Sequence, residues 1–265
     1  MALIVVGSAK GAPGVSTTAL ALAAAWPGEQ VPVVVEADPW GGDALARFGL
    51  LDSPSLVTLA AAARRAGLAE RLVYTHAQLL LGGVPVVAAP AVPAQSSAAL
   101  GVLEEHWPDI ELGQTVMLAD VGRMGPSLGP VGNLVAAADL AVLVTRGAIE
   151  DLAHAEAAVP RLRAVVRRVA VVVVGQCGWS AVEVGQVLGA DVCWQLPFDA
   201  RSARVLRGAP AERRLPPWRR FPLLDAAGRL AEAVGALVPA SEASEPAATE
   251  SAGDGLAAML GGERP

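Results

Sequence analysis

Apolar runs alternate with alanine- and leucine-rich helical segments along most of the chain. The apolar runs are short and rich in β-branched residues, as in Val171-Val172-Val173-Val174, which is typical of central strands buried on both faces. This alternation predicts an α/β domain with a doubly wound, mostly parallel sheet of seven or eight strands and helices on both faces. The expected strands are 3–7, 32–36, 85–88, 115–120, 140–145, 169–174 and 191–195, and the expected helices are 16–25, 55–66, 94–106, 128–137, 149–163, 181–188, 200–207 and 223–237.

Composition divides the chain into two parts. Residues 1–238 carry the alternating pattern and are long enough for one large α/β domain. From residue 239 to 265 the chain turns to Ala, Ser, Glu and Pro, a composition that cannot bury enough apolar surface to fold. We therefore expect a disordered acidic tail, in which Leu256 to Leu260 offers a short docking turn for a partner.

Composition also narrows the class of protein. No apolar stretch of 18 or more residues stands clear of turn residues and no basic region precedes the first apolar run, so we expect neither a membrane span nor a signal peptide. The net charge of −6 gives the whole molecule no attraction for nucleic acid or anionic lipid. Two cysteines cannot form a disulfide framework, and they fit a reducing, cytoplasmic location.

The segment SAKGAPGVSTT, residues 8–18, joins the first expected strand to the first expected helix. A strand, a glycine-containing turn and a helix start together form an anion site, because backbone N–H groups converge there and the helix N-terminus adds partial positive charge. Gly11 and Gly14 let the backbone approach a phosphate closely. Ser16 and Thr17 supply hydroxyls where a phosphate-bound Mg²⁺ needs a ligand.

Lys10 is the only lysine among 265 residues, against nineteen arginines. Its place inside the phosphate loop favours a functional role for a compact, flexible ammonium group. The alternative is that the lysine stands there by chance in a chain poor in lysine. The loop also lacks the usual G-K-[ST] ending, because Val15 follows Gly14 where a lysine is standard.

These residues resemble the deviant phosphate loop of the ParA/MinD superfamily of P-loop ATPases, K-G-G-x-G-K-[ST]-[ST]. In that family the first lysine reaches across a nucleotide-sandwich dimer to the partner's phosphates. The resemblance implies a P-loop NTPase fold, ATP and Mg²⁺ as cofactors, and a nucleotide-dependent homodimer with Lys10 as a catalytic residue. Ala12 and Val15 depart from the pattern, and Val15 implies weak ATP hydrolysis at best. The implied nucleotide-binding residues of the loop are Lys10, Gly11, Ala12, Pro13, Gly14, Val15, Ser16 and Thr17.

The second expected strand ends in Glu36-Ala37-Asp38, followed by Pro39-Trp40-Gly41-Gly42-Asp43. Two acidic groups at a strand end can hold a water, or a Mg²⁺-bound water, beside the phosphates. Asp38 matches the family aspartate that positions the attacking water, so the resemblance implies a catalytic and Mg²⁺-linked role for it. The longer string to residue 50 resembles the TadZ/CpaE branch, which positions pilus-assembly and secretion machinery. The alternative is an ordinary acidic turn.

Two further segments carry candidate chemistry. The strand 115–120 closes on Asp120, which resembles the family's Walker B carboxylate and implies a Mg²⁺ role, with Gly122 or Gly125 as a γ-phosphate sensor; the alternative is a helix-capping or turn aspartate. Arg123 follows as a candidate contact for phosphate or for a dimer mate. Leu196-Pro197-Phe198-Asp199 resembles the family's I-P-[FYW]-D turn, which implies that Pro197 and Phe198 flank the base.

The remaining basic cluster surrounds Trp218 and comprises Arg213, Arg214, Arg219 and Arg220. Such a cluster can hold DNA through charge and stacking, but a solvated connection to the last helix is the favoured interpretation. The chain's last residues contain one basic residue, Arg264, so no membrane-inserting helix is expected.

Three functions fit these observations. The first is an ATP-dependent dimerising switch that positions or partitions a cargo, either a pilus or secretion apparatus or DNA, with a protein partner. The second is a degenerate scaffold that binds partners without nucleotide turnover, because Val15 removes a phosphate-facing charge. The third is a metabolic P-loop enzyme, which is disfavoured because the chain shows no second substrate domain.

Overall fold

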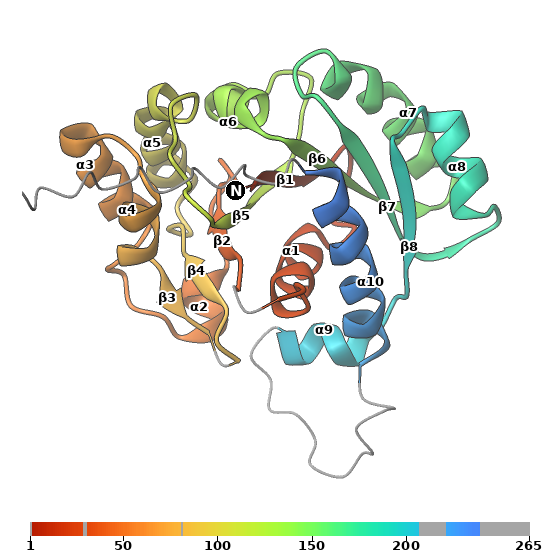
Figure 1. Ribbon diagram of the computed structural model, residues 1–265, viewed down its shortest axis with the longest axis horizontal. Helices are drawn as coiled ribbons and strands as arrows, with labels where there is room; N and C mark the ends of the chain where they lie inside the picture. The colour runs from red at the N-terminus through yellow and green to blue at the C-terminus, as the bar shows by residue number, and fades with distance from the viewer. Residues whose placement is uncertain (1, 29–30, 81, 207–220, 239–265) are drawn as a thin grey trace, which may run out of the picture.

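The computed structural model describes residues 2–28, 31–80, 82–206 and 221–238. Within them one eight-stranded sheet runs in the order β3-β4-β2-β5-β1-β6-β7-β8 (Figure 1). The strands are β1 (Ala2–Ser8), β2 (Val33–Glu36), β3 (Gln78–Leu79), β4 (Pro85–Val87), β5 (Val116–Arg123), β6 (Leu140–Gly147), β7 (Val169–Cys177) and β8 (Val192–Leu196). All neighbouring strands pair in parallel except β3, which pairs antiparallel with β4 at the sheet edge. This topology confirms the predicted fold class.

Each expected strand and helix is present, with ends shifted by a few residues. The helices are α1 (Val15–Ala24), α2 (Ala44–Phe48), α3 (Leu56–Ala66), α4 (Glu70–Thr75), α5 (Pro93–Leu103), α6 (Gly132–Ala137), α7 (Ile149–Arg163), α8 (Ala181–Leu188), α9 (Ala200–Leu206) and α10 (Pro222–Leu237), with short 3₁₀ turns η1 (Glu104–His106) and η2 (Gly129–Val131). The pattern did not predict α2, α4 or β3, which are only two to six residues long. None of the described helices has the length and apolar character needed to cross a bilayer.

The sheet is buried on both faces, which explains its continuous apolar strands. Alternate β1 residues belong to different cores: Leu3 and Val5 face the helices α3 to α8, and Ile4 and Val6 face α1 and α10. Figure 1 shows α1 and α10 together on one side of the sheet, with α3, α5, α6, α7 and α8 on the other. Two hydrophobic cores of this kind hold the strands, and therefore the loops between them, in fixed register.

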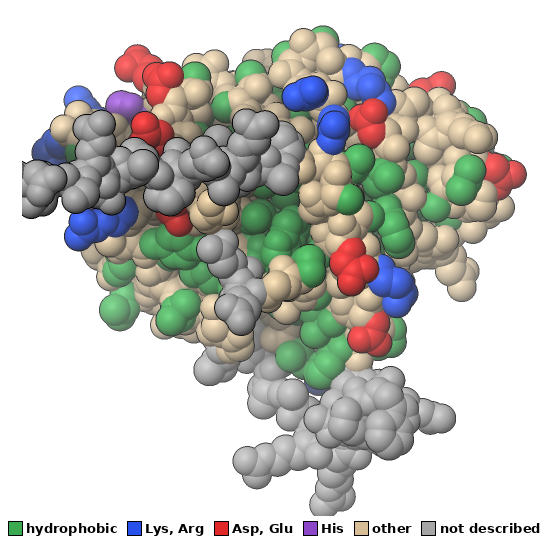
Figure 2. Space-filling model, in the orientation of Figure 1, with side chains coloured by type: hydrophobic (Ala, Val, Ile, Leu, Met, Phe, Trp, Pro, Cys, Tyr) green, Lys and Arg blue, Asp and Glu red, His purple; other side chains and the backbone are tan. Residues whose placement is uncertain are grey.

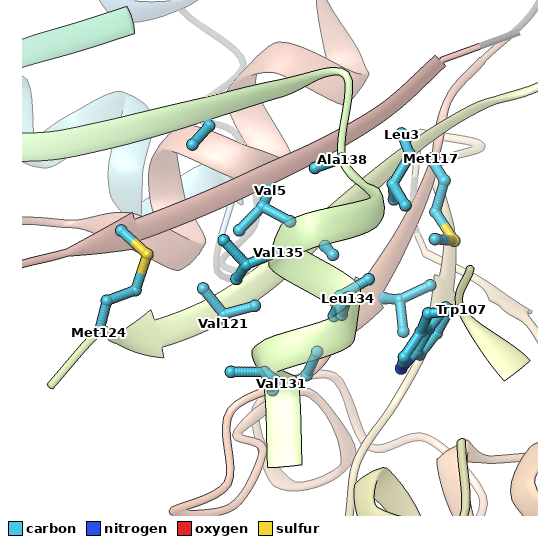
Figure 3. Close-up of a cluster of buried hydrophobic side chains, with 14 of the residues drawn as sticks. Leu3, Val5, Trp107, Met117, Val121, Met124, Val131, Leu134, Val135 and Ala138 are labelled. Atoms are coloured by element: carbon cyan, nitrogen blue, oxygen red, sulfur yellow. The ribbon is translucent and has the colours of Figure 1, made fainter. Parts of the chain in front are cut away.

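Figure 3 shows part of the core beneath α6, where Leu134 and Val135 point toward Leu3 and Val5 of β1. Trp107 is fully buried beside this cluster. Its Nε1 is the one buried side-chain polar atom of the described residues that lacks a hydrogen-bond partner. Apolar packing alone therefore holds the indole ring.

The carboxyl ends of β1, β2, β5 and β6 meet at one edge of the sheet. Register places Asp120 of β5 beside Val6 of β1 and beside Glu36 of β2. On the other side of β1, Ser8 pairs with Val144 of β6. Open parallel sheets place their sites at this edge, so the loops after these strands form the candidate site.

Candidate functional site

The loop between β1 and α1 has the backbone of an anion cradle. Gly11 and Gly14 have φ angles of +65° and +108°, conformations that L side chains rarely adopt. Gly14 also occupies the position before the first turn of α1, and no side chain caps that turn. The first amide groups of a helix have no intrahelical partner, so those of α1 remain available to a bound anion.

The side chains of the loop divide between solvent and core. Lys10 lies exposed near the tip of the loop, and Ser16 and Thr17 are half-buried at the start of α1. Val15 is only 7% exposed and belongs to the core cluster that contains Ile4 and Val6. The valine therefore does not fill the cradle, but it brings no charge to the cradle either.

The hydroxyl of Ser16 hydrogen-bonds the carboxyl group of Asp120 across the start of α1. Asp120 is 4% exposed, and its Oδ1 also accepts a bond of 3.0 Å from the backbone N–H of Gly122. Burial, with a smaller contribution from the nearby charge of Asp38, raises the pKa of Asp120 to about 6 against the lowering effect of the two hydrogen bonds. A hydroxyl and a carboxylate are oxygen ligands of the kind that Mg²⁺ prefers.

Asp38 lies half-buried just beyond the end of β2. Its Oδ1 accepts a 2.9 Å hydrogen bond from the N–H of Trp40, and its own carbonyl accepts one of 2.7 Å from Ser96 Oγ. Burial raises the pKa of the Asp38 carboxyl, with a smaller contribution from Asp43. The three residues predicted for Mg²⁺, namely Ser16, Asp38 and Asp120, thus lie together in this structure.

Glu36 does not take the role that its spacing from Asp38 predicted. Its Oε1 accepts hydrogen bonds from the N–H groups of Asp43 and Ala44, both 2.9 Å, and its Oε2 accepts one of 3.0 Å from Ala89. This buried carboxyl fastens β2 to the start of α2 and to the segment after β4, so it is not free to hold a catalytic water. Burial raises its pKa to about 7, despite the three N–H donors.

Protein side chains alone do not form a metal site in the described part of the chain. No group of three or more His, Cys, Asp or Glu residues there could hold a metal ion. A cation bound by Ser16 and the carboxylates would need further oxygen ligands, which phosphates supply in many nucleotide sites. The donor set therefore fits Mg²⁺ bound together with a nucleotide.

The candidate γ-phosphate sensors lie in different places. Gly122 lies among the carboxylates, and its N–H already bonds Asp120. Gly125 lines a separate cavity of about 530 Å³, together with Arg123 and the exposed Trp40. The structure therefore associates Gly122, rather than Gly125, with the carboxylate cluster.

A cavity of about 250 Å³ opens beside the phosphate loop. Pro13, Gly14 and Thr17 line it at the loop end, while Pro197 and Phe198 line it from the turn after β8. Asp199 of that turn caps α9, because its Oδ1 accepts hydrogen bonds of 3.1 Å from the N–H groups of Arg201 and Ser202. The predicted base-flanking residues thus lie next to the predicted phosphate loop.

Sequence reasoning missed Arg146, which also lines this cavity. Arg146 follows Thr145 on β6, and its Nη2 donates a hydrogen bond of 3.4 Å to the carbonyl oxygen of Ala12. The position becomes significant only once β6 is known to pair with β1. A basic residue near the end of an expected strand was the only available signal.

Two predicted features lie outside the described residues: the arginine cluster at positions 213, 214, 219 and 220, and the tail 239–265. On the face of the molecule in Figure 2, acidic and basic side chains are interspersed among apolar and neutral ones.

No protein-family model and no curated protein matches the chain. Solved structures do match it. The cell-division ATPase MinD of Pyrococcus furiosus aligns with a TM-score of 0.66 and 20% sequence identity, over 90% of this chain and 100% of that one. A ParA family ATPase from Chlorobium tepidum TLS aligns with a TM-score of 0.64 and 18% identity, over 87% of this chain and 97% of that one.

A third neighbour was solved with a ligand. The septum site-determining protein MinD of Pyrococcus horikoshii OT3, complexed with Mg-ADP, aligns with a TM-score of 0.60 and 19% identity, over 88% of this chain and 96% of that one. At these identities the comparisons establish the fold. The chain has the P-loop NTPase fold of the ParA/MinD-type ATPases, as the loop resemblance implied.

Proposed function

We propose that this chain, whose fold is that of the ParA/MinD-type ATPases, is an ATP-dependent dimerising switch that positions or partitions a cellular cargo. The observation that carries the proposal is the meeting of Ser16, Asp38 and Asp120 beside an uncapped, glycine-shaped helix start. A hydroxyl and two carboxylates beside free helix amides are the groups that a Mg-nucleotide needs, which favours the switch over a scaffold.

Each part of the site has a distinct task in this proposal. The amides of the loop and of the first turn of α1 hold the phosphates. Ser16 and Asp120 hold Mg²⁺, directly or through water, and the metal neutralises phosphate charge when bound. Pro197 and Phe198 flank the base from the turn after β8. A bound Mg-ADP in a structural neighbour supports this choice of cofactor.

Asp38 and Lys10 carry the switching chemistry. Asp38 is half-buried at the edge of the site, where its carboxylate accepts a proton from a hydrolytic water. Lys10 is exposed at the loop, which leaves its ammonium free to reach the nucleotide of a partner subunit. Hydrolysis is weak because Val15 supplies no charge to the phosphates, and such a rate suits a switch whose signal is the state of the dimer.

The cargo belongs to the same proposal. The resemblance of the segment after β2 to the TadZ/CpaE branch favours a pilus or secretion apparatus, recruited through a protein partner in the cytoplasm. DNA contact through Arg213, Arg214, Arg219 and Arg220 is the less favoured alternative, and membrane insertion is not part of the proposal.

Calorimetry and light scattering test the switch. We expect the wild type to bind Mg-ATP and to form a dimer only when Mg-ATP is present. Lys10→Ala removes the only lysine, so it should keep ATP affinity within a few-fold and lose ATP-dependent dimerisation. Arg65→Ala on the exposed end of α3 removes one positive charge elsewhere and should behave as the wild type. A dimer that forms equally with and without nucleotide would contradict the switch.

The burial of Val15 favours a second candidate, a non-hydrolysing scaffold. The missing charge-assisted contact is worth about 1.5–3 kcal/mol, or roughly 10- to 100-fold in affinity. Nucleotide-independent dimerisation, with no measurable ATP binding, is the result that this scaffold predicts.

A further inference from the structure

The phosphate loop lacks a cation at the start of its helix. Val15 stands at that position, and its side chain lies in the core rather than over the loop. Lys10 lies at the opposite end of the loop and is exposed. If the chain binds ATP as proposed above, a positive charge from another element would replace the one that Val15 does not supply.

Strand β6 places an arginine where that charge is needed. Because Ser8 and Val144 are paired, the residues that follow Val144 run beside the loop that follows Ser8. Arg146 lies two residues beyond that pair, and its Nη2 lies 3.4 Å from the carbonyl oxygen of Ala12. The guanidinium group therefore already touches the phosphate loop.

The guanidinium is available to a ligand. A donor–acceptor distance of 3.4 Å is longer than that of an ordinary N–H···O bond, so the contact with Ala12 is weak. The two ion pairs of the described residues join Arg47 to Asp43 and Arg163 to Asp191, so neither engages Arg146. The side chain is exposed, and leaving its weak carbonyl contact for a phosphate would cost little.

The cavity beside the loop gives the ligand an orientation. Gly14 and Thr17 of the loop line it, and so does Arg146, which contacts Ala12 of the same loop. Pro197 and Phe198 line it from the turn after β8, where Asp199 and Arg204 are also lining residues. An anionic group suits the loop residues, and the flat, apolar face of a base suits Pro197 and Phe198. Arg146 therefore faces the phosphate end of a nucleotide in this cavity.

We propose that Arg146 is a phosphate-binding residue that supplies, from β6, the positive charge that Val15 does not supply from α1. This inference rests on the proposed ATP binding and adds a residue that the loop motif does not contain. A guanidinium presents a planar fork of N–H donors that matches phosphate oxygens, which an alkyl ammonium at the same place does not reproduce.

Calorimetric titration with Mg-ATP, Mg-ADP and adenosine tests this role. Arg146→Ala should lower the affinity for Mg-ATP and for Mg-ADP by about 10- to 100-fold, because a charge-assisted contact is lost. The affinity for adenosine, which has no phosphate, should stay unchanged. Arg146→Lys keeps the positive charge but lacks the planar set of N–H donors, so its nucleotide affinity should lie between those of the wild type and Arg146→Ala. Arg65→Ala makes the same change of net charge on α3 and should match the wild type. Circular dichroism and urea unfolding of each variant establish that it is folded.

The outcomes separate the two proposals. If the wild type binds Mg-ATP and Arg146→Ala binds it equally well, Arg146 has no phosphate role, while the proposed nucleotide site stands. If Arg146→Ala loses as much affinity for adenosine as for ATP, Arg146 shapes the cavity and does not bind phosphate. A wild type that binds no nucleotide overturns the proposed function and this inference together.

Discussion

The carboxyl group of Asp38 occupies the space that a side chain at position 122 would need. Gly122 has a φ angle of +60°, and its N–H binds Asp120, so one glycine touches both carboxylates of the candidate site. The absence of a side chain there lets a loop from β2 close over the end of β5.

Gly122→Ala should therefore disturb the site and the fold together. The positive φ costs about 1–2 kcal/mol for a residue with a Cβ atom, and Asp38 must also move. Gly49→Ala is the matched control, because Gly49 has a φ of +61° with open space around it. Urea unfolding should show a larger loss of stability for Gly122→Ala, and equal losses would mean that Asp38 moves aside freely.

Ser16→Ala should remove the dependence of ATP affinity on Mg²⁺. The Ser16 hydroxyl bonds Asp120, whereas Thr17 lines the nucleotide cavity. We expect Ser16→Ala to weaken Mg-ATP binding about tenfold and to leave metal-free ATP binding unchanged. Thr17→Val should lower the affinity for Mg-ATP and for metal-free ATP equally. Calorimetry with Mg²⁺, and with EDTA in its place, measures the two affinities. A loss in Ser16→Ala that is the same with and without Mg²⁺ would argue against a metal role for Ser16.

Val15→Lys should lower the stability of the fold and raise its affinity for ATP. The valine is buried in the core with Ile4 and Val6, so its replacement should lower the free energy of unfolding by about 1–3 kcal/mol. If the loop backbone is intact, the new ammonium group can reach the phosphates and should tighten ATP binding. Val15→Met, an uncharged chain of similar reach, is the control in the same two assays. Unchanged ATP affinity in Val15→Lys would show that an ammonium group at this position does not reach bound phosphates.

Glu36 should make stability fall as the pH rises. The folded protein retains the Glu36 proton up to about pH 7, whereas the unfolded chain releases it near 4.5. The contribution of Glu36 to the free energy of unfolding is therefore largest below pH 4.5, declines between 4.5 and 7, and is constant above 7. Asp120, whose pKa is raised to about 6, adds a decline of the same sign.

Glu36→Gln should flatten this decline, as measured by urea unfolding between pH 4.5 and 8. The variant keeps the shape of the side chain and loses its titration, although one of its N–H partners is left without an acceptor. Glu156→Gln removes an exposed carboxylate from α7, so its profile should run parallel to that of the wild type. An unchanged slope in Glu36→Gln would show that this carboxyl is ionised throughout.

The sheet was predictable because its signals are local. Runs such as Val33-Val34-Val35 show their burial on both faces directly in the sequence. The short elements were not predictable, because distant partners define them: Gln78 of β3, for example, donates hydrogen bonds to the carbonyls of Leu51 and Pro54. Such contacts leave no periodic pattern in the chain.

The same distinction holds for the site. The phosphate loop could be recognised because eight consecutive residues shape it. Glu36 was misinterpreted because one of its amide partners, Ala89, lies 53 residues further along the chain. Arg146 was overlooked because its value depends on which strand lies next to β1. Roles that depend on strand order need the structure.

The exposure of Lys10 has a practical consequence. Apart from a free α-amino group, amine-reactive dyes can modify this protein at one side chain only, and that side chain lies on the phosphate loop. Acylation there removes the ammonium charge of the proposed subunit contact, so the labelled protein should lose ATP-dependent dimerisation as Lys10→Ala does. Slower acylation of that amine after nucleotide is added would report that the protein, not yet labelled, has formed the proposed dimer.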